Sequence, residues 1–578
     1  MLDDASFKDM VHAIRASAHV PKKQDSVTTM RTVKKAMMEK VARMMKGEHV
    51  CITSDGWTSC ANDTYMSLTV TLITSAWKLV TLSVDCSKSE GTTTGDALAA
   101  GIKAAVAKHG LAGKITAITT DCEPSMVKMG RLLEEDDVCT HIGCCNHRLE
   151  STTSIVFNGP GVKKVMALAR GVVTRYSTSS QAADRLAQFV KTYLGSEKKR
   201  VIQDVATRWW STCSMVGRLL ELKVAIDKHE EADKLDPLLT AADWAVLELI
   251  LPILEPFRHT QTLLEGRKYV TGSLVVPFIY DLRNSLEDAI DDLNELQPSS
   301  NADVNTARAA VKPCVAALRD DFINRWGDGR DILTYAEGNR RQPRGFKPVQ
   351  VLATALDPRT KILWGAEENE KAGVWKLVQE EAVKIAVQNR TETNFQGASS
   401  QQRPEASAAA ATLTTGAGEE DSSRKRPRRG GGGFMAAAQA VGDAPVQQVG
   451  EGADSSTTSL ITNSVRVELE AFQASSGIKM YELDKEGTRV YLDPLDWWRV
   501  RRTDFPHLAN LARRVLAIPA TQAESERLFS CAGNIVTKNR NKLAPPTVEL
   551  LVLLRHSWKI VEEWEASNNA AARAAKRG

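Results

Sequence analysis

Two runs rich in β-branched residues lie far apart in the chain, and both end on an aspartate. The first, HVCITSD, spans residues 49–55, and the second, KITAITTD, spans residues 114–121. An aspartate followed by glycine, as at Asp55, also suits an ordinary surface turn. A functional role for the two carboxylates therefore requires the intervening chain to bring the two strand ends together.

The segments around these runs predict a particular strand order. Some stretches alternate apolar and polar residues as strands do, and others repeat every three to four residues as amphipathic helices do. Strands are predicted at 49–55, 64–74, 77–86, 114–121 and 138–145, and helices at 92–110 and 124–136, with more helices after them. The order β-β-β-α-β-α-β-α is that of the ribonuclease-H-like fold, in which the fourth strand runs parallel beside the first. Asp55 and Asp121 are then expected side by side at one sheet edge.

The rest of the chain predicts a long helical region and a linker. Helical periodicity dominates from about Met215, and Pro252 and Pro256 are expected to kink or break its first amphipathic helix. Residues 391–458 consist largely of Ala, Gly, Ser, Gln and Pro, which bury too little apolar area to offset the entropy lost on ordering. We therefore expect a disordered linker there, with helical sequence resuming after it.

The bulk composition narrows the class of protein. A chain of 578 residues exceeds the size of one core, and 43% hydrophobic with 25% charged residues is typical of a globular protein. Ten cysteines without a CxxC pair favour a reducing compartment over a disulfide scaffold. No apolar run approaches the roughly 20 residues that a membrane helix needs. The net charge of +4 permits a nucleic-acid partner without requiring one.

Two aspartates at one sheet edge suit metal-assisted phosphodiester chemistry. Cleaving a phosphodiester needs an activated oxygen nucleophile, a stabilised leaving oxygen and relief of the negative charge on the phosphate. A pair of Mg²⁺ ions supplies all three, and these hard cations prefer carboxylate oxygens as ligands. Asp55 and Asp121 are therefore candidate metal ligands, although two aspartates at strand ends also arise by chance.

Seven short motifs occur in a fixed order along the chain. They are TSDGWTS at 53–59, TTDCEPSM at 119–126, CCNH at 144–147, DVATRWWST at 204–212, ALDPRTK at 355–361, DPLDWW at 493–498 and IPATQAESERLFSCAG at 518–533. Together they resemble the hAT superfamily of cut-and-paste DNA transposases. The resemblance covers nearly the whole chain except the low-complexity linker, and its specificity comes from the combination of motifs rather than from any one of them.

The resemblance implies a catalytic triad of acidic residues at Asp55, Asp121 and Glu526, the last within AESERLFS. The triad would hold Mg²⁺ (or Mn²⁺) for hydrolysis of one DNA strand. The new 3′-hydroxyl would then attack the opposite strand and leave a hairpin on the flanking DNA. Glu524 is the local rival for the third position, but two positions away on a helix it would point elsewhere.

The resemblance also implies the domain organisation. The expected fold class is α/β, with a ribonuclease-H-like catalytic domain interrupted by a large all-α insertion and followed by a helical C-terminal dimerisation module. The predicted ranges are 1–48 for an N-terminal helical segment, 49–214 for the first part of the ribonuclease-H-like domain, 215–390 for the insertion, 391–458 for the linker, and 459–578 for the end of the insertion, the last catalytic helix and the dimerisation region. The apolar stripes LANLARRVLAI and VELLVLLRHSW suit either a dimer interface or an internal core.

Two residues match a Cys-x-x-His motif that contacts or organises DNA in the family, namely Cys144 and His147. A buried cysteine and a core or capping histidine are the alternative. With Cys139 and His141 they also supply four potential zinc ligands, but the spacing is tighter than in ordinary structural zinc sites, and a strand would point them to different faces.

Other candidate DNA contacts are aromatic or basic. Trp209, in TRWW, matches a tryptophan that stacks on a flipped base, and Arg208 precedes it, although most tryptophans are packing residues. A basic group close to Glu526 suits either a passing phosphate backbone or a solvated surface. It comprises Arg527, Lys538, Arg540 and Lys542.

Localisation and the second candidate function follow from two further features. The run RKRPRR at 424–429 is similar to a nuclear localisation signal, which agrees with a transposase and implies the nucleus.

Many relatives begin with a zinc-binding BED finger, and we expect it to be missing here, because no matching Cys/His set precedes residue 50. Its absence keeps open a domesticated, catalytically inactive regulator. Either function implies DNA and a second copy of the chain as partners, with no membrane and no small-molecule substrate.

Overall fold

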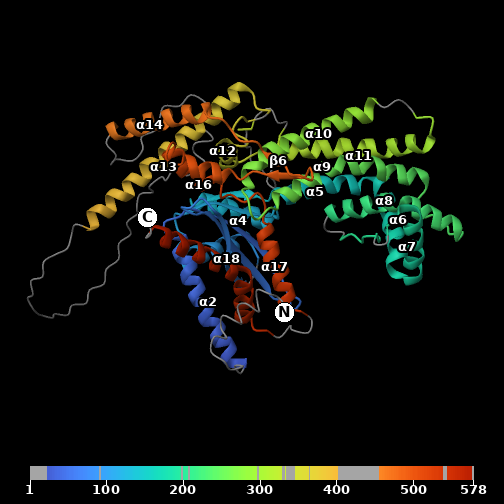
Figure 1. Ribbon diagram of the computed structural model, residues 1–578, viewed down its shortest axis with the longest axis horizontal. Helices are drawn as coiled ribbons and strands as arrows, with labels where there is room; N and C mark the ends of the chain where they lie inside the picture. The colour runs from blue at the N-terminus through green and yellow to red at the C-terminus, as the bar shows by residue number, and fades with distance from the viewer. Residues whose placement is uncertain are drawn as a thin grey trace, which may run out of the picture.

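The computed structural model combines a central β-sheet with many helices (Figure 1). It describes residues 23–89, 93–196, 199–205, 209–295, 299–327, 332–333, 345–363, 365–400, 455–537 and 543–575. The sheet lies near the middle of the molecule, and the helices between α6 and α11 extend away from it to one side. The expected mixed α/β class is therefore observed. In the described ranges, no helix has both the length and the apolar character needed to cross a bilayer.

The sheet has five strands in the order β3-β2-β1-β4-β5. The strands are β1 (Val50–Thr58), β2 (Thr64–Ile73), β3 (Leu79–Lys88), β4 (Ile115–Thr120) and β5 (Thr140–Gly143). The first three pair antiparallel as a meander, whereas β4 pairs parallel with β1 and β5 pairs parallel with β4. The predicted meander is confirmed, and so is the predicted position of the fourth strand beside the first.

The first strand is longer than the sequence predicts. We expected it to end at Asp55, but β1 continues to Thr58, and Asp55 pairs with Ser67 of β2. The continuation is possible because β2 supplies backbone partners beyond the point where β4 has ended. Asp55 therefore lies within a β-hairpin that extends past the parallel part of the sheet.

The first helices cover the sheet and begin the helical region. They are α2 (Lys23–Met45), α3 (Gly95–Lys108), α4 (Pro124–Glu135), α5 (Cys145–Asn158), α6 (Pro160–Thr178), α7 (Ser180–Leu194), α8 (Trp209–Ala232), α9 (Ala241–Leu264), α10 (Val275–Glu295) and α11 (Ala302–Trp326), with a short 3₁₀ turn η1 (Gly272–Leu274) before α10. Pro252 and Pro256 lie inside α9, so of the two expected outcomes, a kink or a break, the break does not occur. Buried residues on both sides of them, such as Ile250 and Phe257, stabilise α9 through tertiary packing.

The remaining elements are α12 (Pro348–Leu356), α13 (Glu368–Ser400), α14 (Ser455–Ala474), the hairpin β6 (Tyr481–Leu483) and β7 (Arg489–Tyr491), α15 (Pro494–Arg501), α16 (Pro506–Val515), α17 (Ala523–Ile535) and α18 (Pro545–Ala575). Helix α13 extends into the start of the predicted linker, and α14 begins shortly before its end. Residues 401–454 of that linker, with the basic run at 424–429, lie outside the described residues.

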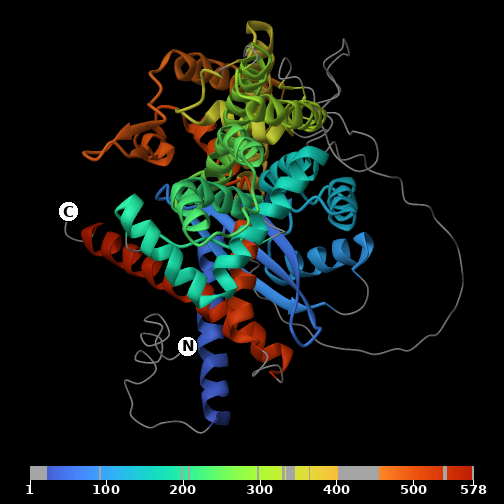
Figure 2. The ribbon, with the colours of Figure 1, turned by 90° about the vertical axis from the view of Figure 1, so that its right-hand side faces the viewer.

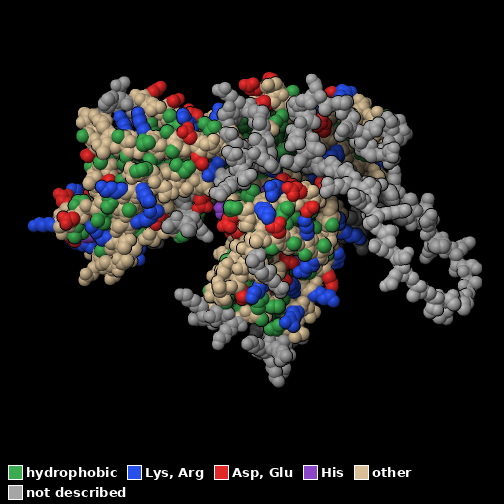
Figure 3. All heavy atoms as spheres, turned by 180° about the vertical axis from the view of Figure 1, so that it is seen from behind, with side chains coloured by type: hydrophobic (Ala, Val, Ile, Leu, Met, Phe, Trp, Pro, Cys, Tyr) green, Lys and Arg blue, Asp and Glu red, His purple; other side chains and the backbone are tan. Residues whose placement is uncertain are grey.

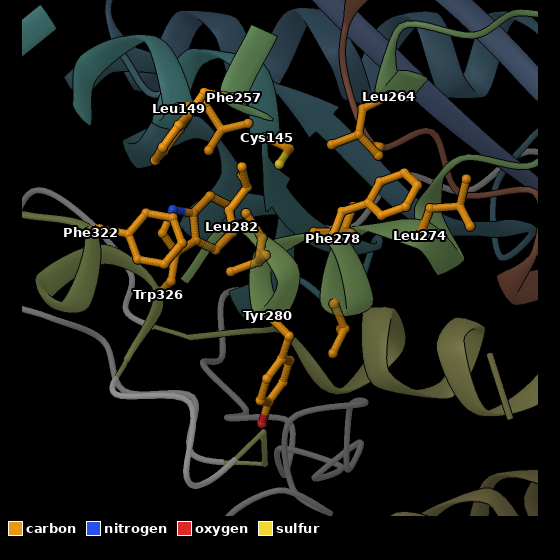
Figure 4. Close-up of a cluster of buried hydrophobic side chains, with 14 of the residues drawn as sticks. Cys145, Leu149, Phe257, Leu264, Leu274, Phe278, Tyr280, Leu282, Phe322 and Trp326 are labelled. Atoms are coloured by element: carbon orange, nitrogen blue, oxygen red, sulfur yellow. The ribbon is translucent and has the colours of Figure 1, made fainter. Parts of the chain in front are cut away.

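Two buried apolar clusters stabilise the molecule. One joins one side of the sheet, including Ile52 and Leu82, to α2, α3, α4, α17 and α18. The other extends from Cys51 and Ala117 of the sheet through the helical region. Figure 4 shows part of this second cluster, where side chains from α5, α9, α10 and α11 converge. The helical region is therefore packed onto the sheet rather than attached through a linker alone.

The C-terminal helices return to the sheet after several hundred residues. Helix α17 contacts β1 and β2, while α18 packs on β3 and against α2, as Figure 2 shows. Ser557 of α18 accepts a hydrogen bond from the backbone N–H of Ser83 at 3.0 Å. The sheet is therefore completed by segments from both ends of the chain, and this return brings Glu526 to the strand edge.

Candidate active site

The two predicted aspartates lie at equivalent positions relative to two neighbouring parallel strands, Asp55 within β1 and Asp121 directly after the end of β4. The pairing between β1 and β4 ends with Thr53 opposite Thr119. Asp55 lies two residues after Thr53, and Asp121 lies two residues after Thr119. Because side chains alternate along a strand, Asp55 and Asp121 project to the same side as these threonines. Thr53 shares a hydrogen bond with Ser525 at 3.0 Å, so this side of the sheet faces α17.

Glu526 approaches from the first turn of α17. The residues just before this helix are attached to three different parts of the molecule. Thr119 donates to the carbonyl of Pro519 at 3.0 Å, Cys145 N–H donates to the carbonyl of Ala520 at 3.1 Å, and Ala520 N–H donates to Thr271 at 3.1 Å. The sheet, α5 and the helical region together therefore set the position of Glu526.

The charges of the three carboxylates act on one another. Burial raises the pKa of Asp55 to about 7, and the nearby negative charges of Asp121 and Glu526 add to the increase. Burial also raises the pKa of Asp121. In the described part of the chain, no Lys or Arg forms an ion pair with any of the three. The predicted triad is thus brought together as a group of negative charge without a Lys or Arg partner among the described residues.

The raised pKa of Asp55 predicts a pH-dependent gain in stability for Asp55→Asn. The folded carboxyl, with a pKa of about 7, keeps a proton that the unfolded carboxyl loses near 3.8, so the parent loses stability as the pH rises between these values. Removing the charge should raise the free energy of unfolding by about 1–3 kcal/mol at pH 8 and by less at pH 5. Urea unfolding at both pH values measures this difference.

The control for that measurement is Asp288→Asn, which changes an exposed aspartate on α10. This substitution should alter stability little at either pH. Equal effects of Asp55→Asn at pH 5 and pH 8 would contradict the proposed charge crowding at the strand edge.

The predicted Cys-x-x-His pair divides into a buried and a partly exposed member. Cys144 is fully buried just before α5, its backbone N–H donates to the carbonyl of Thr120 at 2.7 Å, and burial raises the pKa of its thiol well above the usual value. The side-chain amide of Gln522 donates a hydrogen bond to Nδ1 of His147 at 3.4 Å, and the proximity of the His147 ring lowers the pKa values of Asp55 and Asp121. Cys144 therefore fits an organising role, and His147 is the member next to the carboxylates.

The rival glutamate, Glu524, faces a different environment from Glu526. It is buried and forms ion pairs with Arg527, with Arg267 at 3.3 Å and with His556 at 3.5 Å. Burial raises the pKa of Glu524, but these partners outweigh burial and hold it below its usual range. Glu524 thus stabilises contacts between α17, α18 and the loop after α9.

Arg527 is also engaged within the protein. In addition to its ion pair with Glu524, its guanidinium donates to the backbone carbonyl of Glu265 at 2.6 Å. The side chain is half-buried, so it links α17 to the end of α9 as well as contributing positive charge near the site. Five other predicted positions lie outside the described residues or side chains: Arg208, the side chain of Trp209, Lys538, Arg540 and Lys542.

A fourth carboxylate, which the sequence analysis did not single out, lies near Glu526. Glu265 follows the end of α9, and burial together with the charge of Glu526 raises its pKa. Its carboxylate accepts hydrogen bonds from Asn146 at 2.8 Å and Gln261 at 3.3 Å. No local pattern in LLEGRK distinguishes this glutamate from an ordinary helix-ending residue, because its position depends on how α9 packs beside α5.

The predicted zinc ligands lie in different surroundings. His141 shares a hydrogen bond with Thr120 at 2.8 Å and packs on Gly130 of α4, whereas His147 faces Gln522. The strand alternation of β5 and the turn into α5 separate the two histidines. Throughout the described ranges, no three or more His, Cys, Asp or Glu side chains are arranged to hold one metal ion.

The three acidic residues nevertheless fit a divalent cation by their chemistry. Their donor atoms are carboxylate oxygens, which hard cations prefer. The three carboxylates repel one another, and no Lys or Arg among the described residues pairs with any of them. Binding an ion would require the side chains of Asp55, Asp121 and Glu526 to close around it.

Three sequence families match this chain. Residues 53–144 match the ZBED1 RNase-like domain, residues 142–253 match the ZBED1 RNase-like helical domain, and residues 479–558 match the hAT family C-terminal dimerisation region. The first range contains most of β1, all of β2 to β5 and both aspartates, and the last contains Glu526. The family names agree with a ribonuclease-like sheet and with a dimerisation region.

Several longer proteins are similar to the chain at low identity. They include "Putative AC transposase" from Zea mays (22% identity over 90% of this chain and 57% of that protein), "Zinc finger BED domain-containing protein 4" from Homo sapiens (21% over 74% and 30%) and "Putative transcriptional regulator tpeD" from Talaromyces stipitatus (22% over 92% and 56%). The chain thus spans little more than half the length of these relatives, or less. The three family matches, together with these relatives, support a transposase-like protein of the hAT family.

Proposed function

We propose that this chain is a metal-dependent hAT-type DNA transposase that cleaves and transfers DNA strands with Asp55, Asp121 and Glu526. The observation that supports this proposal most strongly is the gathering of three acidic side chains from distant parts of the chain, with the pKa of Asp55 raised to about 7. Structural carboxylates are normally paired or solvated, whereas crowded and unpaired ones are typical of functional sites.

The proposed architecture is a ribonuclease-H-like domain interrupted by a helical insertion. The strand order and the return of α17 and α18 to the sheet after α5 to α16 support it. In this arrangement the insertion lies in the sequence between Asp121 and Glu526, and in space it supports the segment that leads into α17. The C-terminal region would join two copies of the chain into a dimer.

In the proposed reaction, Asp55, Asp121 and Glu526 would hold divalent ions such as Mg²⁺ or Mn²⁺. When bound, such ions activate the attacking oxygen and relieve the negative charge of the phosphate. Asp55 must lose the proton that its raised pKa retains before its carboxylate can serve as a ligand. Gln522 would orient the His147 ring through their hydrogen bond.

The proposed partners are DNA and a second copy of the chain. The proposed location is the nucleus, supported by the RKRPRR run in the sequence and by the similarity to a transposase. Lys and Arg are interspersed with Asp and Glu on the face shown in Figure 3, so DNA contact on this face would depend on local groups rather than on one extended basic surface.

The test is strand cleavage of DNA that carries the genomic sequence from both sides of the gene, where the terminal inverted repeats of a transposon would lie. The parent should cleave in Mg²⁺ or Mn²⁺ and not in EDTA, whereas Asp121→Asn should lose nearly all cleavage, because an amide binds the cation poorly. Asp288→Asn, an exposed control, should cleave like the parent. Cleavage by Asp121→Asn at the parental rate would overturn the assignment of the site.

A second candidate function is a dimeric DNA-binding regulator without catalytic activity. The relative named as a transcriptional regulator, which matches 92% of this chain, favours it. Absence of cleavage by a folded dimer supplied with complete DNA ends would support this regulator. A metal-induced rise in melting temperature that Asp121→Asn abolishes would instead support the transposase, even before its DNA ends are known.

A further inference from the structure

Two arginines close to Glu526 share one carboxylate. Arg267, in the loop after α9, lies with its Nε 3.3 Å from one oxygen of Glu524, and Arg527 on α17 pairs with the other oxygen. The side chains of Arg267 and Arg527 are 37% and 40% exposed, whereas that of Glu524 is only 10% exposed. Glu524 therefore holds two partly exposed guanidinium groups close together.

The loop that carries Arg267 is attached to the first turn of α17. Arg527 donates to the backbone carbonyl of Glu265 at 2.6 Å, and the negative charge of Glu526 acts on the carboxyl of Glu265. Arg527 also directly follows Glu526 in the chain. The two arginines thus belong to the same group of side chains as the third proposed metal ligand.

Contacts within this loop fix its conformation. The Tyr269 hydroxyl donates to the backbone carbonyl of Leu263 at 2.7 Å and so connects the two ends of the loop. A Cβ atom at Gly266 would lie 2.2 Å from the Tyr269 ring, so this close approach requires glycine. Because the loop is held in this way, Arg267 needs little further ordering when it binds a partner.

Both guanidinium groups keep N–H donors for another partner. Each has five such donors, and Arg527 uses two of them for Glu524 and Glu265. The two Nη atoms of Arg267 have no hydrogen-bond partner among the described residues. The planar fork of an arginine matches two oxygens of one phosphate group.

We propose that Arg267 and Arg527 form a phosphate clamp, which holds the DNA backbone beside Glu526. The clamp rests on the proposed function, in which DNA is the partner of this site, and it names the residues that bring the backbone there. The acidic triad repels a phosphodiester, so a DNA strand approaches it only where positive side chains offset that repulsion. Glu524 is then a positioning residue, because it orients both arginines. The clamp acts on DNA of any sequence, since phosphate contacts carry no sequence information.

The experiment measures binding of a short end-labelled DNA duplex of arbitrary sequence to the full chain, by fluorescence anisotropy in EDTA over a range of salt concentrations. EDTA removes divalent ions, so cleavage does not contribute. Arg267→Gln should weaken binding by about threefold to tenfold at about 0.1 M salt. It should also reduce the slope of log K against log salt by about one, because one phosphate contact is lost. Arg267→Lys keeps the charge and should keep the slope.

The matched control is Arg258→Gln on α9. Arg258 is 39% exposed and donates to Glu255 at 3.1 Å, so it resembles Arg267 in charge, exposure and carboxylate pairing but lies outside the loop. The control should bind the duplex with the affinity and salt slope of the parent.

Arginine footprinting of the unchanged parent provides an independent measurement. Phenylglyoxal modifies accessible guanidinium groups, and mass spectrometry identifies the modified positions. The duplex should protect Arg267 and Arg527 from modification but leave Arg258 as reactive as in the free protein. This measurement needs no variant, so it does not depend on how well a substituted chain folds.

Several results would overturn the clamp. They are a parent that does not bind the duplex, a parental salt slope in Arg267→Gln, a slope lost in Arg267→Lys as well, an equal loss in Arg258→Gln, or no protection of Arg267 by DNA. Because binding is measured without metal, a parent that binds through the clamp but cleaves no DNA would refute the catalytic proposal alone.

Discussion

Glu526→Gln is expected to abolish metal-dependent strand cleavage while the chain stays folded. Glu526 is exposed on α17 and has no ion-pair partner among the described residues, so the amide should cost little stability. A neutral side chain at this position removes one of three carboxylates from the proposed metal site. The single-turnover cleavage rate should therefore fall by about three orders of magnitude or more.

The neighbouring glutamate supplies the matched control. Glu524→Gln should leave the three carboxylates in place but lower the free energy of unfolding by about 1–3 kcal/mol, because Arg267 and Arg527 lose a buried partner. Urea unfolding and cleavage rates of the two variants separate these effects. If Glu524→Gln, when folded, loses cleavage and Glu526→Gln keeps it, the assignment of the third acidic residue is wrong.

Asp357→Ala is expected to cause the largest loss of stability. Asp357 and Arg359 form an ion pair at 2.6 Å in which both side chains are completely buried. Asp357 also accepts a hydrogen bond from Ser273 at 2.6 Å, and Arg359 donates to the carbonyl of Leu492 at 3.0 Å. Removing one partner leaves a buried charge uncompensated, which costs about 3–5 kcal/mol.

The comparison for that loss is a pair of the same type at the surface. Asp496 and Arg499 pair at 3.1 Å on α15 with both side chains largely exposed, so Asp496→Ala should change the free energy of unfolding by less than about 0.5 kcal/mol. Chemical unfolding of both variants measures the difference. Similar losses from Asp357→Ala and Asp496→Ala would contradict the buried position of the first pair.

The motif ALDPRTK, which contains the Asp357–Arg359 pair, links three parts of the helical region. Lys361 donates to the carbonyl of Phe472 at 2.7 Å, and Arg359 donates to the carbonyl of Val270 at 3.4 Å. The motif therefore joins α12 to α14 and to the loop before η1. That loop contains Thr271, which accepts a hydrogen bond from Ala520 just before α17. The motif is thus structural, and it supports the segment that positions Glu526.

Local sequence patterns predicted much of the sheet and two of the three acidic residues. Strand alternation and helix periodicity are written in neighbouring residues, which is why the meander and the succession of strands and helices along the chain were predictable. The place of β4 beside β1, and with it the alignment of Asp55 with Asp121, was expected from the topology of the ribonuclease-H-like fold. The ends of the strands and helices were less predictable. Strand β1 extends to Thr58 because its partner β2 continues, and α9 continues through Pro252 because packing compensates for the lost hydrogen bond.

The sequence by itself determined the strand order, the two strand-edge aspartates and, through the seven motifs, the hAT resemblance with Glu526 as the expected third carboxylate. Only the tertiary structure decided that Glu524 is an internal ion-pair partner, that Glu265 joins the acidic group, and that the apolar stripes of α16 and α18 are core. The reason is physical. Periodicity tells which side of a helix is apolar, but what that side meets depends on contacts between segments hundreds of residues apart.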